Sequence, residues 1–177
     1  LPLLKNQENI INTTNTSSNP SKEQIINQAI KFHLQGNTPQ AAKYYQYFIN
    51  QGFKDHRVFS NYGVILQGLG KLEEAELSTR KAIQLHPGFA DAHSNLGNIL
   101  RDLGRLQEAE LSYRKAIEIK PNLAEAHSNL GNTLRDLGKL KEAEISTRKA
   151  IELKPDLAEA HSNLSNVLID LGKLKEE

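Results

Sequence analysis

Cysteine is absent from this chain of 177 residues, and so are methionine and tryptophan. Without cysteine the chain has no disulfide framework, no thiolate metal site and no thiol nucleophile. An excess of charge of either sign is also missing, because 22 lysine and arginine residues stand against 21 aspartate and glutamate residues. The net charge of +1 gives no overall attraction to nucleic acid or to anionic lipid.

Long apolar runs and aromatic residues are scarce as well. No segment reaches the roughly 18 consecutive apolar residues that a membrane-spanning helix needs. Aromatic residues make up 6% of the chain, and bases are matched by acids along it, which argues against nucleic-acid binding. We therefore expect no membrane and no nucleic-acid partner. The compartment stays open, with the cytoplasm slightly favoured.

What the chain has in abundance is repetition, with a period of thirty-four residues from residue 56 to residue 157. Residues 90–123 and 124–157 differ at eight positions, and most exchanges are conservative, such as Asp91 to Glu125. Residues 56–89 follow the same scheme of glycine, alanine and proline. A fixed period of this length indicates an array of stacked units, each too small to bury its own apolar face.

Each unit is predicted to be two helices joined by a turn. In residues 90–123, apolar side chains at helical spacing mark a first helix from Ala92 to Leu103, and Gly104 stops it. A second apolar face begins at Leu106 and ends before Pro121, which cannot continue a helix. Glycine and alanine recur in fixed slots of the two helices, where small residues let helix axes approach closely.

The outer side of each second helix carries an acid followed four residues later by a base. This order favours ion pairs along an isolated helix. We interpret these pairs as a solvated charged face with no further role. They are Glu76 and Arg80, Glu110 and Arg114, and Glu144 and Arg148.

The residue order within each unit resembles the tetratricopeptide repeat. In residues 90–123 the resemblance is carried by His93 and the Asn–Leu–Gly segment at 95–97, followed by Gly104, two alanines and Pro121 in set slots. It implies an all-α, right-handed α-solenoid of antiparallel helix-turn-helix repeats. Residues 1–21, which include a stretch rich in asparagine, threonine and serine, are predicted to be a flexible leader or linker. The array would fill residues 22–177, with a degenerate unit at 22–55, full units at 56–89, 90–123 and 124–157, and a truncated unit at 158–177.

One polar slot of the repeat is always asparagine, and we call these four residues the asparagine ladder: Asn61, Asn95, Asn129 and Asn163. The repeated Ser-Asn-Leu-Gly-Asn motif is similar to the superhelical repeats of the O-linked N-acetylglucosamine transferases. That resemblance implies that asparagines in this slot line the inner surface and hold the backbone of a bound peptide. Nothing in the chain resembles a sugar-nucleotide site, so transferase activity does not follow.

Spacing alone extends the ladder into a polar strip on the first helices. Counted with the serine before each ladder residue, polar side chains spaced three, four and seven residues apart share one face and widen the ladder: Asn98, Asn132, Asn166, Arg101 and Arg135. A side-chain amide offers a donor and an acceptor, which suits any peptide group. The alternative is that the asparagines fix repeat geometry through bonds to neighbouring helices. The arginines could equally pair with aspartates of adjacent units, such as Asp102 and Asp136.

Metal binding and catalysis are not expected. His93, His127 and His161 occur once per unit, too far apart to converge on zinc, and core packing accounts for them. Because serine, histidine and aspartate recur identically in each unit, no unique catalytic cluster forms, and no cofactor is predicted. A clamp for a terminal carboxylate would need lysine among the asparagines, where the chain has serine.

The sequence thus favours a protein-protein interaction module that binds an extended peptide along its concave, asparagine-lined surface, without enzymatic activity. One alternative is a substrate-recruiting or regulatory arm of a larger enzyme such as a glycosyltransferase. Another is a structural spacer or self-assembly array. Either self-association through the last helix or a disordered terminus is predicted, because Leu164, Val167, Leu168 and Leu171 lack a second helix to cover them.

Overall fold

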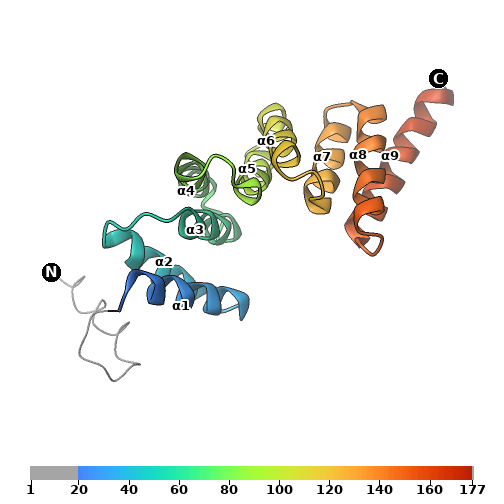
Figure 1. The fold of residues 1–177 in the computed structure, drawn as a ribbon. Helices are drawn as coiled ribbons and strands as arrows, with labels where there is room; N and C mark the ends of the chain where they lie inside the picture. The colour runs from blue at the N-terminus through green and yellow to red at the C-terminus, as the bar shows by residue number, and fades with distance from the viewer. Residues whose placement is uncertain (1–19, 177) are drawn as a thin grey trace.

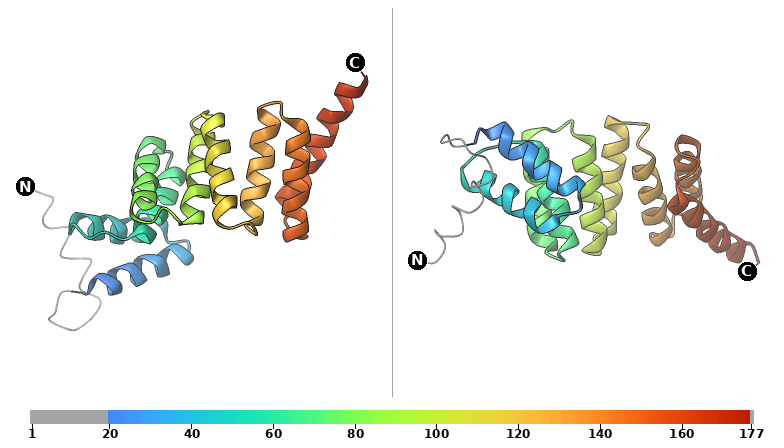
Figure 2. Two further views of the ribbon diagram at one scale, coloured as in Figure 1. Left: turned by 45° about the horizontal axis from the view of Figure 1, so that its top comes forward. Right: turned by 90° about the horizontal axis from the view of Figure 1, so that it is seen from below.

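The computed structural model describes residues 20–176, with side chains described to residue 172, and this part of the chain forms nine α-helices and no strand. The predicted leader at 1–21 lies outside the described residues except for Pro20 and Ser21. The helices form successive antiparallel hairpins along a curved path, and α1 and α9 lie at opposite ends of it (Figures 1 and 2). Their bounds are α1 Lys22–Leu34, α2 Thr38–Asn50, α3 His56–Gly68, α4 Leu72–Leu85, α5 Ala90–Asp102, α6 Leu106–Ile119, α7 Ala124–Asp136, α8 Leu140–Leu153 and α9 Ala158–Glu176.

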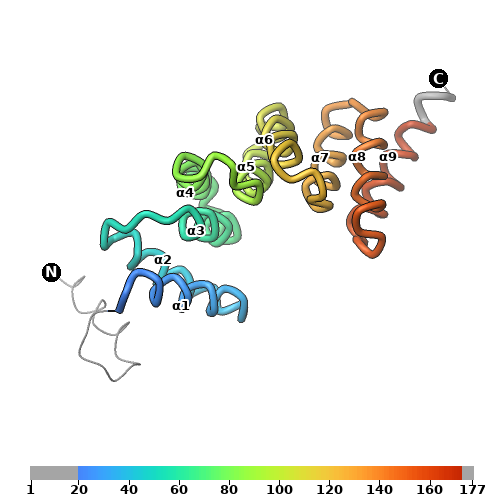
Figure 3. The backbone as a smooth tube through the Cα atoms, viewed as in Figure 1, coloured from blue at the N-terminus to red at the C-terminus, as the bar shows by residue number. Residues whose placement is uncertain are grey.

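Glycine ends the first helix of each hairpin. In α5 the N–H of Gly104 donates to the carbonyl of Arg101 at 2.9 Å, and the N–H of Arg105 donates to that of Leu100 at 2.8 Å. Gly104 has a φ of +74°, the left-handed conformation that glycine adopts without strain. The chain can therefore reverse within three residues and begin α6, so the antiparallel pairing is encoded locally (Figure 3).

Small residues let the two helices of a hairpin come close together. A Cβ atom built on Gly131 of α7 would lie 3.2 Å from the carbonyl oxygen of Ala143 in α8, and one on Gly63 would be equally close to that of Ala75. Ala75, Ala109 and Ala143 are fully buried. The close approach predicted from the small residues is thus present in the structure.

The apolar core is divided along the array. Aromatic and aliphatic side chains of α1 and α2, among them Tyr45 and Phe48, pack with Val58 and Ile65 of α3 in one cluster. A second cluster runs from Leu96 in α5 to Val167 in α9. Stability of such an array is the sum of local contributions from neighbouring units.

The last helix is covered better than the sequence suggested. Val167 was expected to be uncovered, but it is fully buried, because α9 packs against both α7 and α8 and the side chain joins the second cluster. Leu171 is partly buried against the same cluster. Exposed aliphatic surface on α9 is found at Leu168, 42% exposed, and Ile169, 55% exposed. The prediction of self-association through this helix now rests on those two residues.

Candidate functional site

The first helices of successive units carry every residue of the predicted strip. Asn61 lies on α3, the residues from Asn95 to Arg101 on α5, those from Asn129 to Arg135 on α7, and Asn163 and Asn166 on α9. These helices pack on one another directly, α3 with α5, α5 with α7 and α7 with α9. The fold therefore brings side chains that are thirty-four residues apart in sequence onto neighbouring helices.

Every asparagine of the ladder donates a hydrogen bond from Nδ2 to the preceding unit. The Nδ2 group of Asn95 donates to Ser60 Oγ at 3.1 Å, and that of Asn163 donates to Ser128 Oγ at 3.0 Å. Both serines are almost fully buried. In the first hairpin the acceptor is different, because Asn61 Nδ2 donates to the hydroxyl oxygen of Tyr45 at 3.2 Å. These bonds fix the orientation of each amide plane.

Asn129 is held by a chain of two hydrogen bonds. Its Nδ2 donates to Asn98 Oδ1 at 2.9 Å, and the same oxygen accepts from the hydroxyl of Tyr113 at 2.7 Å. Burial raises the pKa of the Tyr113 phenol well above its usual range, so the group remains a donor at neutral pH. The chain ties α6 to α5 and α5 to α7.

One position of the second helix holds tyrosine and threonine in alternate units. Tyr45, Thr79, Tyr113 and Thr147 occupy equivalent positions thirty-four residues apart. After a tyrosine unit, the next ladder asparagine is tied to that tyrosine, directly for Asn61 and through Asn98 for Asn129. After a threonine unit, it is tied to a buried serine of the preceding first helix. Ladder asparagines tied to a tyrosine therefore alternate with ladder asparagines tied to a serine along the array.

The other half of each ladder amide has no partner in the described part of the chain. No hydrogen bond from residues 20–172 reaches the Oδ1 of Asn61, Asn95, Asn129 or Asn163. Each Nδ2 also carries a second hydrogen. An acceptor and a donor thus remain on Asn61, Asn95 and Asn129, which is the pair of groups that a peptide bond requires. On Asn163 the acceptor remains, because its Nδ2 also donates to the carbonyl of Ser128 at 3.4 Å.

The remaining residues of the predicted strip differ among themselves. The Asn98 side chain accepts from Tyr113 and Asn129, whereas the side chains of Asn132 and Asn166 make no hydrogen bond within the described residues. Arg135 Nε lies 2.6 Å from Asp170 Oδ2 of the next unit. Arg101 forms no ion pair within residues 20–172, and its buried Nη1 has no hydrogen-bond partner there.

Ion pairs on the second helices do more than cover a solvated face, which corrects the interpretation made from the sequence. Glu110 is only 8% exposed and accepts from Arg114 at 3.0 Å and from Lys139 of the next unit at 2.7 Å. Burial acts to raise the pKa of this carboxyl, but the hydrogen bonds from Lys139 and Arg114 outweigh it and lower the pKa below its usual value. Glu76 joins Arg80 and Arg105 in the same way, at 2.8 and 2.7 Å.

The repeated histidines lie at the junctions between units, so the expected role in core packing is wrong. Nε2 of His93, His127 and His161 lies 2.8–2.9 Å from the carbonyl oxygen of the proline six residues earlier. His93 and His127 are partly exposed and His161 is exposed. The imidazole thus holds the turn that leads into each first helix. Within the described residues no group of three histidine, aspartate or glutamate side chains could hold a metal ion.

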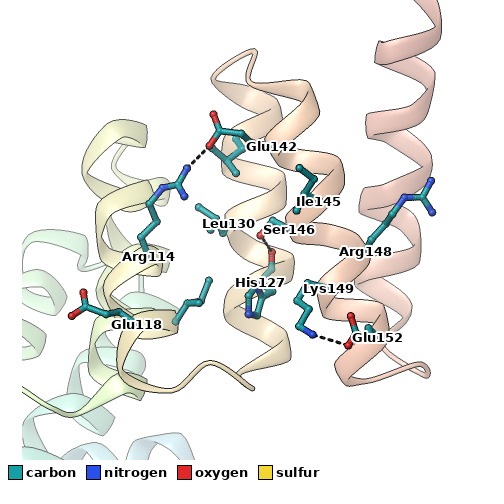
Figure 4. Close-up of a pocket in the computed structure, with 12 residues that line it drawn as sticks. Arg114, Glu118, His127, Leu130, Glu142, Ile145, Ser146, Arg148, Lys149 and Glu152 are labelled. Carbon is teal, nitrogen blue, oxygen red and sulfur yellow. Dashed lines mark hydrogen bonds and ion pairs between the residues drawn. The ribbon is translucent and has the colours of Figure 1, made fainter.

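Two features were missed in the sequence. Asn27 of α1 stands thirty-four residues before Asn61 and is exposed, so the same slot holds asparagine in the first unit too, which the period alone could have found. The second feature is a groove of about 790 Å³ between α6 and α8 (Figure 4). Leu130 and Leu134 of α7 line it, with Ile117 of α6 and Ile145 of α8. The sequence feature that could have indicated this groove is an aliphatic residue that recurs among the charged residues of each second helix.

No helix in the described part of the chain is long and apolar enough to cross a membrane. Models of the tetratricopeptide repeat match residues 56–89, 79–110 and 124–157, and a model described as TPR repeat matches residues 97–138. Together these matches span residues 56–157. No curated protein matches the chain in sequence.

Solved structures with the same fold include MamA 41-end from Desulfovibrio magneticus RS-1, which is 19% identical, with a TM-score of 0.74 and coverage of 88% of both chains. YrrB, described as a TPR protein with an unusual peptide-binding site, is 21% identical over 80% of this chain and 73% of its own, with a TM-score of 0.70. The first TPR of Spaghetti (RPAP3), bound to the HSP90 peptide SRMEEVD, is 24% identical over 66% of this chain and 93% of its own, with a TM-score of 0.64. At these identities the likeness concerns the fold.

Proposed function

The chain belongs to the tetratricopeptide repeat family, and from that premise we propose that it binds an extended segment of another protein along the inner face of its first helices. The asparagine ladder would contact the backbone of that segment. Two of the similar structures are described as binding peptides, which supports a peptide as the ligand class. The proposal gives the chain a role in protein-protein interaction without a reaction of its own.

The observation that carries the proposal is the half-engaged state of the ladder amides. Each Nδ2 donates to the preceding unit, and no described residue bonds to the Oδ1 atoms. None of these Oδ1 atoms is among the buried unpartnered atoms of the described residues, so each is open to solvent and can be reached by a ligand. An amide that is held at one end and open at the other is preorganised, so less side-chain entropy is lost on binding.

Spacing along the array matches an extended ligand. Packed helices lie roughly 8–10 Å apart, and an extended strand rises about 3.3 Å per residue. Successive asparagines would therefore meet the ligand backbone about every third residue. Since they contact peptide groups, binding through the ladder tolerates many ligand sequences. Asn132 and Asn166, which have no partner in the described part of the chain, would supply further contacts at one end of the strip.

Matched substitutions separate ligand binding from repeat packing. A peptide is first selected on the intact chain from a random library, and its affinity is then measured for Asn95→Ala and for Ser60→Ala. Both variants remove the hydrogen bond between the two residues, but only Asn95→Ala also removes Oδ1. We expect both to lose similar thermal stability, and Asn95→Ala to bind about five- to tenfold more weakly than Ser60→Ala.

Asn163→Ala and Ser128→Ala provide a second pair, in which Ser128→Ala removes the bond from Asn163 Nδ2 to Ser128 Oγ but leaves the longer one to the Ser128 carbonyl at 3.4 Å. Equal affinities within both pairs, together with equal losses of stability, would show that the asparagines serve repeat packing alone. A selected peptide whose affinity is unchanged by all four substitutions would place its binding site elsewhere on the chain.

A further inference from the structure

The outer side of the array carries a row of exposed aliphatic side chains. Leu77 on α4, Leu111 on α6 and Ile145 on α8 occupy the same slot in successive units and are 71%, 68% and 70% exposed. Leu111 also lines a smaller groove of about 430 Å³ between α4 and α6, the counterpart of the larger one between α6 and α8. Leu111 and Ile145 each line such a groove together with buried leucines of the first helix beneath it, so the apolar surface there is continuous, and a continuous apolar surface of this kind marks a contact surface.

The groove between α6 and α8 has two parallel helices as walls and α7 as its floor (Figure 4). Leu130 and Leu134 form the apolar floor and are almost fully buried beneath the opening. Two polar groups of the lining are already bonded within the chain, since Ser146 Oγ donates to the carbonyl of His127 at 3.0 Å and His127 Nε2 lies 2.9 Å from the carbonyl oxygen of Pro121. At 3.6 residues per turn, Asn129 and Asn132 lie on the far side of α7 from Leu130 and Leu134.

Charged side chains along the rim are paired with one another. Arg114 of α6 reaches across to Glu142 of α8 at 2.6 Å. On α8, Lys149 lies 2.6 Å from Glu152, and Arg148 lies 2.9 Å from Glu144. Glu118 of α6 is paired with Lys115 at 2.7 Å. The rim therefore presents neither a free cation nor a free anion among the described residues, so it does not select a strongly charged ligand.

These observations restrict the occupant to one kind of structure. The walls are helices whose backbone groups are bonded internally, and the lining offers a ligand few free hydrogen-bonding groups. A segment that enters such a groove must satisfy its own backbone, which an α-helix does and an extended strand does not. Helix side chains at positions i, i+4 and i+7 also pack well between parallel helices.

We propose that the groove between α6 and α8 is a second binding site, which receives an amphipathic α-helix of a partner protein with an aliphatic stripe and little net charge. Ile117 and Ile145 contact the flanks of that stripe, and Leu130 lies beneath it. The walls contain 14 residues each, so they accommodate a helix of about four turns. The site faces away from the asparagine ladder, and the two sites can be occupied together.

The test uses the full chain and a synthetic helical peptide of about 16 residues, built from alanine, glutamine, lysine and glutamate with leucines at i, i+4, i+7 and i+11. Binding is followed by fluorescence anisotropy. We expect micromolar affinity that Ile145→Glu weakens by about tenfold or more and that changes less than about twofold with added salt. Ile145 is largely exposed, so the fold should survive, and circular dichroism checks that it does.

Leu77→Glu is the matched control, because Leu77 has the same slot and exposure but lines neither groove. It should leave the affinity unchanged, as should Asn95→Ala on the inner face. A peptide of the same composition, with its leucines spread around the helix, should bind at least about tenfold more weakly. Equal binding of the two peptides, or equal effects of the two glutamate variants, would overturn the proposal. So would concentration-dependent self-association that Ile145→Glu abolishes, since the occupant would then be a second copy of the chain.

Discussion

At the scale of single residues, the contact between Gly97 and Tyr113 shows how the hairpins differ. A Cβ atom on Gly97 would lie 2.6 Å from the Tyr113 ring, whereas one on Gly63 or Gly131 would meet the side chain of Thr79 or Thr147 instead. The phenol occupies space over the glycine and extends to Asn98. The same ring therefore fills the hairpin and holds the ladder.

Gly97→Ala should destabilise the protein by about 1–3 kcal/mol, because the added methyl collides with a fully buried ring that cannot move aside. Urea unfolding measures the change. Gly68→Ala is the control, since a Cβ atom at that helical position meets nothing within 4 Å. The control should be neutral or slightly stabilising. Equal destabilisation by both substitutions would contradict the assigned contact.

The sequence alone identified the ladder but not the state of its amides. The period placed Asn95, Asn129 and Asn163 in one slot, and repetition of the slot is sufficient for that inference. Which acceptor each Nδ2 finds depends on whether the preceding second helix carries tyrosine or threonine, a residue on a different helix whose reach only the packed structure reveals. The outer groove was missed for a similar reason, because its walls come from two units.

At the scale of helices, the units are joined by ion pairs to two carboxylates, the buried Glu110 and the partly buried Glu76, as well as by apolar contacts. Glu76 and Glu110 each accept from a base on their own helix and from a base that precedes the next second helix. Helix ends were predictable from Gly104 and Pro121, since these residues act through the local backbone. The burial of Val167 was not predictable, because it depends on how α9 settles against α7 and α8.

Glu110→Gln should lower stability at neutral pH by about 1–2 kcal/mol and reduce the loss of stability in acid. The folded-state pKa of Glu110 is below its ordinary value of 4.5, so its contribution is fully present above about that pH and is lost as the pH falls through the folded-state pKa. Urea unfolding between roughly pH 6 and pH 3 measures both effects. Glu118→Gln is the control, because Glu118 is exposed and pairs only with Lys115 on its own helix. An unchanged acid limb in Glu110→Gln would refute the inter-unit role.

At the scale of the whole molecule, each unit contacts mainly the units next to it, and the described residues form two main apolar clusters. The aromatic cluster of α1, α2 and α3 shares no residue with the cluster that runs from α5 to α9. A third, smaller cluster around Ile99 connects them through α3 and α5. Damage to one end should therefore be felt mainly at that end.

Phe48→Ala tests this division, because Phe48 is fully buried in the first cluster. Loss of the ring should cost about 3–5 kcal/mol and accelerate amide hydrogen exchange in α1 to α3, while α7 and α8 keep their protection. Exchange followed helix by helix gives the measurement. Uniform acceleration across α1 to α9 would show instead that the array unfolds as one cooperative unit.

Tyrosine and threonine alternate at positions 45, 79, 113 and 147, so the surroundings of the ladder asparagines repeat every two units and not every unit. If every ladder asparagine were alike, a bound strand could slip by one unit and find the same surroundings. Ladder asparagines tied to a tyrosine alternate with ladder asparagines tied to a serine. A ligand shifted by one unit would therefore face asparagines of the other kind, and only a shift by two units would give each ligand residue the same surroundings again. If the ladder binds a peptide as proposed, a sequence-tolerant surface would in this way still hold its ligand in one register.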